Sequence, residues 1–356
     1  MSSPPLIPDP RPWAFTRAEL TAGLRAFTGD PTLNISNIEE KDIPNRRPAV
    51  GRIRGLTVSC QALSGNKVFN LTLKEPQGTT RTGTAGAGRR EVLFYRSLAG
   101  QLPVRVPQLL AAHPEGEWLV LNMLPEGIQP EQWSASNYLF AIDQLAVLHD
   151  RFWGLGEDLG TYAWLARPLG ADYGIYLRAA YTGMRKLVEK VTSNLITRDP
   201  HIIKMLKSLV EHASEIAAAL RASPTTLLHG DYWPGNMVVY PDSTLTVYDW
   251  QQAAIGPGVL DLFHFIHASQ WYFTDLPISP EEIVTHYRNN LENCCGQRWE
   301  DVEWAALWDY ALLWTFLSSW VDLLASIPAS VLQARFPQMN MLWLEPVEAA
   351  MQRRLR

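Results

Sequence analysis

The sequence predicts an α+β protein in which a small antiparallel β-sheet comes first and a larger, mainly helical part follows. Three strand-like segments near the N-terminus carry the sheet, and Ser64-Gly65-Asn66 forms a hairpin turn between the second and the third. These segments are residues 33–43, 52–61 and 67–74. From Ser134 onward, apolar residues return at helical spacing. A strand–turn–strand pattern at residues 237–248 interrupts this helical part.

The remaining elements follow the same two periodicities. One helix is predicted at residues 15–27, before the sheet, and another at residues 89–98, after its third strand. Two shorter strand patterns, at residues 108–112 and 117–123, extend the sheet. Further helices are predicted at residues 138–153, 173–191, 202–220, 261–273, 280–295, 302–325 and 331–354.

A chain of 356 residues, 47% of them hydrophobic and 19% charged, has ample material for one large or two medium globular domains. We divide it into an N-terminal β-rich lobe, residues 1–123, and a C-terminal, mainly helical lobe, residues 124–356. The 36 acidic residues exceed the 31 basic ones, which argues against nucleic acid and against an anionic membrane surface as partners.

Neither secretion nor membrane insertion is indicated. The Pro-rich N-terminal segment lacks the apolar stretch of a signal peptide, and the most apolar late segment, Tyr310 to Val321, is too short to span a bilayer. Three cysteines cannot build a disulfide framework. We therefore expect a soluble, cytoplasmic protein.

The strand–turn–strand pattern is flanked by the polar residues that suggest chemistry. A tight loop, His229 to Asn236, precedes the first strand and contains Asp231, while Asp249 follows the second strand. The two arms of this hairpin should place Asn236 and Asp249 side by side. Their oxygen atoms suit Mg²⁺, which keeps several waters and bridges phosphates. Asp231 is placed to accept a proton from an attacking hydroxyl.

The spacing of these residues resembles a known enzyme family. Asp231 and Asn236 have the Asp-x4-Asn spacing of kinase catalytic loops, and the full pattern is HGD-x4-N, a strand and then Asp249-Trp250. It resembles the aminoglycoside phosphotransferase and choline kinase superfamily of small-molecule kinases. The later segment GPGVLDL is similar to the family's G-x-P-x-x-D-L, although Pro257 falls one place early. The resemblance implies a protein-kinase-like fold of two lobes.

The resemblance also implies roles for the loop residues. Asp231 would accept or orient the proton of the acceptor hydroxyl, and Asn236 and Asp249 would hold Mg²⁺ at the β- and γ-phosphates of ATP. We interpret His229 and Gly230 as structural, because a histidine can brace the loop by hydrogen bonds and a glycine permits close approach of the chain. An alternative stays open, in which HGD is only a turn and Asp249 only ends a strand.

The order of elements in the N-terminal lobe supports the same interpretation. Lys74 ends the third strand, a loop rich in Gly and Thr follows, and Glu91 lies in the first turn of the next helix. In kinases this order gives a lysine that holds phosphates and a glutamate that holds the lysine. The alternatives are a solvated Lys74 beside Glu75, and a Glu91 that only interacts with the helix dipole.

Further nucleotide contacts are predicted from the order of elements alone. Asn122, Met123 and Leu124 stand where the superfamily has the hinge between its lobes, whose backbone groups pair with adenine. A strand that simply ends at a turn explains the same residues. The phosphates would be covered by residues 44–51 or 77–88, two glycine-containing loops that lack the GxGxxG pattern.

The acceptor should lie against the helical lobe. Eight of the 14 tryptophans fall at or beyond Trp250, and five of them are on helices that wall the acceptor pocket in the superfamily, although ordinary packing is the simpler explanation of each. These five are Trp271, Trp304, Trp308, Trp314 and Trp320. Asp301, Glu303 and Asp309 are candidate contacts for a cationic acceptor. No dense acidic cluster accompanies them, so an aminoglycoside is not the first expectation.

The sequence therefore predicts an ATP-dependent phosphotransferase that moves the γ-phosphate to a hydroxyl of a small molecule, with Mg²⁺ as cofactor. A nucleotide-binding regulator without turnover is the alternative; the degenerate glycine loop favours it, and the intact Asp231, Asn236 and Asp249 oppose it. A protein kinase is disfavoured, because Gly230 replaces the arginine of its catalytic loop and no long segment follows Asp249. The identity of the acceptor, the choice between ATP and GTP, and the oligomeric state stay open.

Overall fold

The computed structural model describes residues 13–41, 43, 52–76, 86–192, 200–273 and 275–355. The loop at residues 44–51 and most of the loop at residues 77–88 lie outside these ranges. The chain divides into two compact units, the first comprising Met1–Thr79 and Pro107–Leu124 and the second comprising Thr80–Val106 and Pro125–Arg356. The predicted lobe boundary between residues 123 and 124 stays a prediction.

The first unit contains an antiparallel sheet of five strands in the order β1-β2-β3-β5-β4. Its strands are β1 (Asn34–Lys41), β2 (Arg52–Ala62), β3 (Gly65–Glu75), β4 (Leu109–Ala112) and β5 (Leu119–Asn122). The β2–β3 hairpin turns where the sequence predicts, with Ala62 paired to Gly65. Gly65 has a φ of 109°, which favours a residue without a Cβ. The expected small antiparallel sheet is confirmed.

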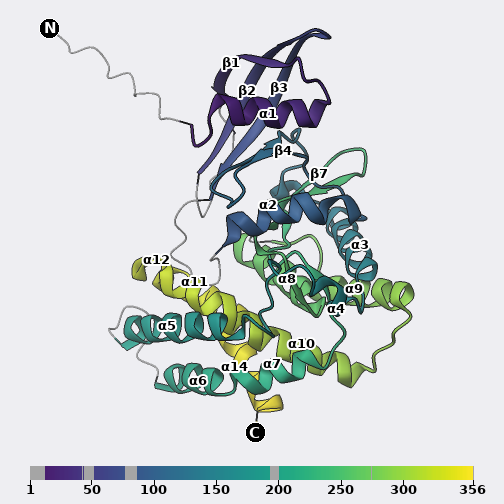
Figure 1. Ribbon diagram of the computed structural model, residues 1–356. Coiled ribbons are helices and arrows are strands. Elements are labelled where there is room, and N and C mark those ends of the chain that lie inside the picture. The colour runs from purple at the N-terminus through teal and green to yellow at the C-terminus, as the bar shows by residue number, and fades with distance from the viewer. Residues whose placement is uncertain are drawn as a thin grey trace, which may run out of the picture. The chain divides into compact units, whose positions relative to one another are not determined.

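Helix α1 (Arg17–Thr28) packs against this sheet (Figure 1). Thr16 caps its N-terminus through a capping box with Glu19, and Gly29 ends it in the left-handed conformation. Leu20 and Leu24 are fully buried in the core that the helix shares with the sheet. The apolar face expected from the spacing of these leucines is thus the face that meets the sheet.

An ion pair is buried within the sheet. Arg54 on β2 and Glu75 at the end of β3 are 4% and 3% exposed. The Arg54 Nε donates to Glu75 Oε2 at 3.1 Å, and Nη2 lies 3.0 Å from the same oxygen. The guanidinium also stacks over Trp13, 4.5 Å from the ring centroid. The opposite charges of Arg54 and Glu75 compensate each other inside an apolar core. Removing either side chain alone would leave the other charge buried without its partner.

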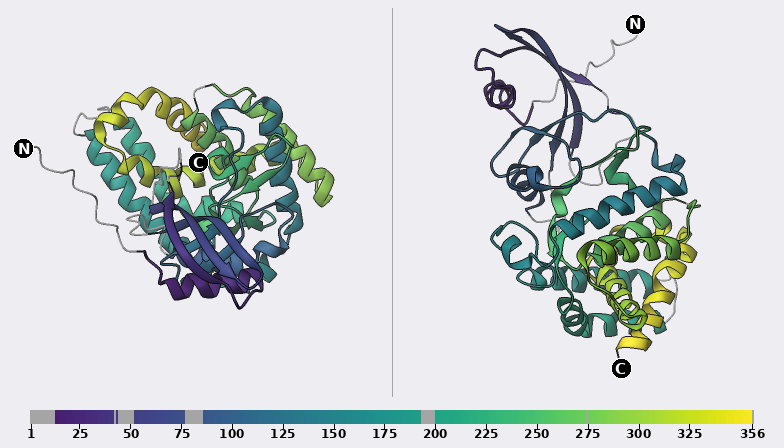
Figure 2. Two further views of the ribbon diagram at one scale, coloured as in Figure 1. Left: turned by 90° about the horizontal axis from the view of Figure 1, so that it is seen from above. Right: turned by 90° about the vertical axis from the view of Figure 1, so that its right-hand side faces the viewer.

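The second unit is mainly helical and contains two small two-stranded sheets (Figures 1 and 2). β6 (Thr226–Leu228) pairs with β9 (Ala254–Gly256), and β7 (Met237–Val239) pairs with β8 (Leu245–Val247). The helices are α2 (Ala87–Ser97), α3 (Ala135–Arg151), α4 (Gly156–Leu159), α5 (Tyr173–Thr192), α6 (Pro200–Glu211), α7 (Ala213–Arg221), α8 (Val259–Tyr272), α9 (Pro280–Cys295), α10 (Asp301–Thr315), α11 (Val321–Ser326), α12 (Ala329–Ala334), α13 (Phe336–Met339) and α14 (Glu345–Arg354). Short 3₁₀ turns lie at Ala99–Gln101, Pro130–Gln132, Pro234–Asn236 and Trp250–Gln252.

Two of the predicted helices contain π-helical turns. The segment at residues 302–325 forms α10, the π turn η6 (Phe316–Trp320) and α11, and a second π turn, η7 (Asn340–Leu344), precedes α14. A π turn widens the helix by one residue and so changes which side chains share a face. Trp320 and Trp343, which lie in these two turns, are both buried, with ring centroids 4.5 Å apart. The helix predicted at residues 302–325 is confirmed as one helical segment that contains a π turn, whereas the helix predicted at residues 331–354 is interrupted by a turn at Arg335. Apolar periodicity does not predict the π turns, because it does not register a one-residue insertion.

The predicted helix at residues 202–220 is also divided, into α6 and α7. His212 separates them with φ −91° and ψ 7°, and its ring Nδ1 donates to the Ser208 carbonyl oxygen at 2.8 Å. This side-chain bond competes with the backbone pattern of the helix. Within the described chain, no helix combines the length and the apolarity that crossing a bilayer requires.

We expect Arg54→Met to lower the free energy of unfolding by about 3–5 kcal/mol, because it leaves the Glu75 carboxylate buried without its partner. The double variant Arg54→Met, Glu75→Leu should recover most of that loss, since neither charge of this pair is then buried without its partner. Urea denaturation of the full chain measures both. The matched control is Lys67→Met, which removes a partly exposed ion pair with Asp30 at 3.6 Å and should cost less than about 1 kcal/mol. A double variant as unstable as the single one would contradict this account.

Candidate active site

The loop between β6 and β7 is braced by the side chain of His229. The His229 Nε2–H donates to the Tyr248 carbonyl oxygen at 3.0 Å, and the Asp231 backbone N–H donates to Nδ1 at 3.2 Å. The ring is fully buried, and this burial lowers its pKa although carboxylates nearby oppose the effect. A neutral imidazole satisfies both hydrogen bonds. The predicted structural role of His229 is confirmed.

Gly230 lies where the chain folds back on itself. Its φ is 81°, and a Cβ at this position would stand 2.2 Å from the Gln252 carbonyl oxygen. Both the backbone conformation and the space exclude a side chain. The predicted role of Gly230 in a close chain approach is confirmed, and it explains why no arginine precedes Asp231.

Asp261, near the start of α8, holds the backbone of the loop. Its Oδ2 accepts the His229 N–H at 2.7 Å, and its Oδ1 accepts the Gly230 N–H at 2.9 Å. Burial on its own would raise the pKa of the Asp261 carboxyl, but the hydrogen bond and charge of His149 lead the contributions that leave this pKa below its usual value. Asp261 therefore stays ionised at neutral pH, and its charge strengthens both backbone bonds.

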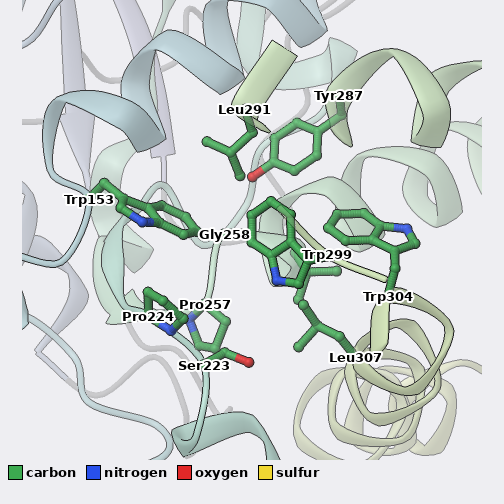
Figure 3. A pocket seen from close by; sticks show the side chains of 11 residues that line it. Trp153, Ser223, Pro224, Pro257, Gly258, Tyr287, Leu291, Trp299, Trp304 and Leu307 are labelled. Carbon is green, nitrogen blue, oxygen red and sulfur yellow. The ribbon is translucent and has the colours of Figure 1, made fainter. Parts of the chain in front are cut away.

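A buried chain of polar groups continues from Asp261 into the helical core. His149 Nε2 on α3 lies 3.4 Å from Asp261 Oδ2, and His149 Nδ1 lies 2.6 Å from the hydroxyl of Tyr287 on α9. The ring of Tyr287 also lines an indentation with Trp153, Trp299, Trp304 and other apolar side chains (Figure 3). This indentation holds about 240 Å³ of space, part of it open to solvent, and none of the loop residues lines it.

The Asp231 carboxylate is held at both of its oxygens. His264 Nε2 on α8 lies 2.8 Å from Oδ1, and Asn236 Nδ2 donates to Oδ2 at 2.8 Å. Burial would raise the pKa of Asp231, but the bond and charge of His264, together with other neighbours that include Asn236, leave that pKa below its usual value. The side chain is nevertheless 22% exposed. Asp231 is thus an ionised, fixed carboxylate that an incoming group can reach.

Asn236 and Asp249 stand at the same end of the β7–β8 hairpin. Met237 pairs with Val247, and the Tyr248 N–H donates to the Asn236 carbonyl oxygen at 2.9 Å. The predicted hairpin is confirmed, and its pairing places Asn236 opposite Tyr248, the residue before Asp249. Asp249 has φ 68° and ψ 55°, a left-handed conformation that is uncommon for a residue with a Cβ and recurs at functional sites.

The donor set at this hairpin end fits Mg²⁺. The Asn236 Nδ2 donates to both the backbone oxygen and Oδ2 of Asp231, so its amide oxygen faces the other way. Mg²⁺ sites commonly take one or two protein oxygens and fill the rest with water and phosphate. A cluster of three or more His, Cys, Asp or Glu side chains able to hold a metal is absent from the described ranges. A metal site built from several carboxylate, histidine or cysteine ligands is therefore not found in the described part of the chain.

Helix α2 is anchored to the turn that follows Asp249. The ring of Phe94 stacks on Trp250, with centroids 4.1 Å apart and an interplanar angle of 9°. Arg90 Nη1 donates to the Gln251 carbonyl oxygen at 2.8 Å, and its Nε donates to the Trp164 carbonyl oxygen at 3.2 Å. Glu91, on the same helix, is fully buried. The helix that carries Glu91 is therefore packed directly on the segment that carries Asp249.

The other predicted nucleotide contacts belong to the first unit. Lys74 is 7% exposed on β3, which does not fit the alternative of a solvated lysine. Asn122 Oδ1 accepts the Gln108 N–H at 2.6 Å, and the Met123 N–H donates to the Asn70 carbonyl oxygen at 3.0 Å. Leu124 is the last residue of this unit. The functions of these residues stay predictions.

The three acids considered for a cationic acceptor are already engaged. Asp309 is buried and accepts bonds from Arg353 and Arg354, with the shortest at 2.6 Å. Asp301 accepts from Arg288 at 2.7 Å, in a surface pair in which the Asp301 side chain is 97% exposed. The Glu303 carboxylate closes a capping box at the start of α10. Of the five tryptophans considered for the acceptor wall, Trp271, Trp304, Trp314 and Trp320 are buried in the core, and Trp308 is partly buried.

Two features of the site escape the sequence reasoning. His264 contacts Asp231 although the two are 33 residues apart, and only its position three residues after Asp261 could have suggested it. Trp233, inside the loop itself, stacks on Tyr272 with centroids 4.7 Å apart, and Tyr272 is 51% exposed. The spacing of the motif predicts roles for Asp231 and Asn236, but it predicts nothing about the residues between them, such as Trp233.

The family of the chain follows from a comparison with protein-family models. Residues 69–296, which include Lys74, the β6–β7 loop and the β7–β8 hairpin, match the phosphotransferase enzyme family. The chain belongs to this family. It is accordingly a small-molecule kinase, and the resemblance noted from HGD-x4-N and Asp249-Trp250 is confirmed.

Solved structures show the same fold for this phosphotransferase. The GDP complex of aminoglycoside 2'-phosphotransferase-IIIa is 12% identical, covers 95% of this chain and 99% of its own, and has a TM-score of 0.50. Macrolide 2'-phosphotransferase MphH from Brachybacterium faecium is 16% identical over 85% of this chain and 95% of its own, with a TM-score of 0.44. An aminoglycoside phosphotransferase from Alicyclobacillus acidocaldarius is 14% identical over 91% and 92%, with a TM-score of 0.47. A search of curated proteins gives no match. The kinase-like α+β fold is confirmed.

We expect Gly230→Ala to abolish most phosphotransferase activity and to destabilise the chain, because the new Cβ would meet the Gln252 carbonyl oxygen at 2.2 Å and displace the loop. The matched control is Gly154→Ala, at a φ of 72° with nothing within 4 Å of the added Cβ. It carries the same left-handed strain, about 1 kcal/mol, without the clash. Thermal unfolding and turnover of the two variants, compared side by side, check this. Equal behaviour of both would show that the close approach at Gly230 is unimportant.

Proposed function

We propose that this phosphotransferase transfers the γ-phosphate of ATP to a hydroxyl group of a small molecule, and that Asp231 receives the hydroxyl proton. The observation that carries the proposal is the ionised Asp231 carboxylate, fixed by two donors and still 22% exposed. In the reaction the hydroxyl oxygen forms a bond to the γ-phosphorus, and the bond from that phosphorus to the bridging oxygen breaks. ADP leaves with the electron pair, and the hydroxyl proton passes to Asp231.

The remaining site residues take the roles that phosphoryl transfer requires. Asn236, through its amide oxygen, and Asp249 would hold Mg²⁺, which when bound neutralises charge on the nucleotide phosphates. Lys74 would hold phosphate and Glu91 would orient Lys74. The backbone of Asn122, Met123 and Leu124 would pair with the base; the Met123 N–H already bonds to Asn70, so this contact would use another group of the segment.

The acceptor is proposed to be neutral or singly charged. A polycationic acceptor needs several carboxylates that are not already paired, and Asp301, Glu303 and Asp309 each bond to an arginine or to a helix end. Two structural relatives are named as an aminoglycoside phosphotransferase and a macrolide phosphotransferase, so both classes belong in an acceptor panel beside simple sugars and amino alcohols. Macrolides should be turned over in preference to aminoglycosides.

Asp231→Asn should reduce kcat by about 10²–10⁴-fold, since a positioned base contributes that much. We expect ATP with Mg²⁺ to raise the melting temperature of the wild type, and we expect both EDTA and the substitution Asp249→Asn to remove this rise. The control is Asp242→Asn, an exposed acid of the same hairpin whose hydrogen bonds within the described ranges go to Thr244 in its turn. It should leave turnover and nucleotide stabilisation unchanged. Wild-type turnover in Asp231→Asn would refute the assignment of the base.

A further inference from the structure

We infer that His264 is a positioning residue that fixes the Asp231 carboxylate for proton transfer from the acceptor. The inference rests on the proposed function of Asp231 as the base. His264 Nε2 lies 2.8 Å from Asp231 Oδ1, and because a carboxylate only accepts, Nε2 carries the proton of this bond. Such charge-assisted bonds are about twice as strong as neutral ones.

Two donors approach the carboxylate from different elements. Asn236 Nδ2, from the 3₁₀ turn before β7, donates to Oδ2, and His264, from α8, donates to Oδ1. With one donor on each oxygen, rotation of the carboxylate about its bond to Cβ would break both hydrogen bonds. The lone pairs that are not used by His264 and Asn236 therefore keep a fixed direction. A base that must meet a hydroxyl proton within about 3 Å benefits from such fixing.

The same face of α8 holds the loop at successive points. Asp261 accepts the backbone N–H groups of His229 and Gly230, and His264, one turn later on the same face, bonds to Asp231. Next along the helix, the ring of Phe265 lies beside that of Tyr232. The helix thus fixes the backbone of the loop through one residue and its reactive side chain through another. The His264 side chain is 18% exposed, whereas that of Asp261 is 2% exposed. The contact between His264 and Asp231 therefore lies nearer to solvent than the contacts of Asp261.

The test compares three substitutions of His264 in the full chain. His264→Gln offers an amide N–H that reaches about as far as Nε2, His264→Asn offers a shorter one, and His264→Leu offers none. We expect Asn and Leu to reduce kcat by about 10–100-fold, the cost of a misplaced reacting group. The KM for ATP should stay within about twofold, and Gln should restore most of kcat. Turnover is measured with ATP, Mg²⁺ and the acceptor found in the panel, and intrinsic hydrolysis of ATP gives a second readout with water as the acceptor.

Controls separate positioning from folding. His286→Leu removes another histidine–aspartate bond, 2.6 Å to Asp143 at the surface of α9, and should leave kcat unchanged. In an Asp231→Asn background, His264→Leu should have no further effect on kcat, because the two residues act as a unit. The Gln and Asn variants both keep a polar side chain, so their comparison remains decisive where the Leu variant does not fold.

The outcomes distinguish this inference from the proposed function. An active wild type with an equally active His264→Asn variant would overturn the positioning role and leave the function of Asp231 standing. A Gln variant as impaired as the Leu variant would also overturn it, since the hydrogen bond would then not be the determinant. A wild type without turnover on any acceptor, and without hydrolysis of ATP, would instead refute the proposed function.

Discussion

The carboxylate of Asp261 accepts the backbone N–H groups of His229 and Gly230, and the geometry of the β6–β7 loop depends on these two bonds. The chain leaves β6 at Leu228 and turns before Asp231, so these N–H groups have no strand partner. A buried N–H without a partner costs about 1–3 kcal/mol, and a buried carboxylate without donors costs more. The two N–H groups and the Asp261 carboxylate therefore supply each other's hydrogen-bond partners. Asp261 on α8 therefore stabilises the turn that presents Asp231, together with the hydrogen bonds of the His229 side chain.

The second constraint is the left-handed conformation of Asp249. Strain of this kind costs about 1–3 kcal/mol and persists only where the surroundings determine the backbone. The following residue supplies that determination: Trp250 is fully buried, with its ring 4.1 Å from that of Phe94 and 4.5 Å from that of His229. Aromatic packing behind the hairpin therefore sets the direction in which the Asp249 carboxylate leaves the backbone. The indole ring of Trp250 also contacts His229, which braces the loop that carries Asp231. The segments that carry Asp231 and Asp249 therefore both pack against Trp250.

The sequence alone was sufficient to predict those parts of the site whose positions follow from neighbouring residues and from strand pairing within one hairpin. Asp231, Asn236 and Asp249 lie on one loop and one hairpin, whose ends meet by strand pairing. His264 was not predictable in this way, because its contact depends on how α8 packs against the loop. The sheet and most helices followed from periodicity, whereas the π turn at Trp320 did not, since one inserted residue leaves the composition of the helix unchanged. The acids on α10 looked available in the sequence, and only the fold showed that arginines distant in the chain occupy Asp309.

The anchoring of α2 bears on how such a kinase is controlled. In protein kinases, activity depends on whether the helix that carries the conserved glutamate is correctly positioned. Here Phe94 stacks on Trp250 and Arg90 donates to two backbone carbonyls of the same unit. Displacing α2 would break an aromatic pair that contributes about 0.5–1.5 kcal/mol to stability beyond the burial of its area. It would also break two hydrogen bonds that contribute about 0.5–1.5 kcal/mol each. Gly230 in place of an arginine removes the partner for an activating phosphate as well. Packing and hydrogen bonds thus fix α2 to the segment that carries Asp249.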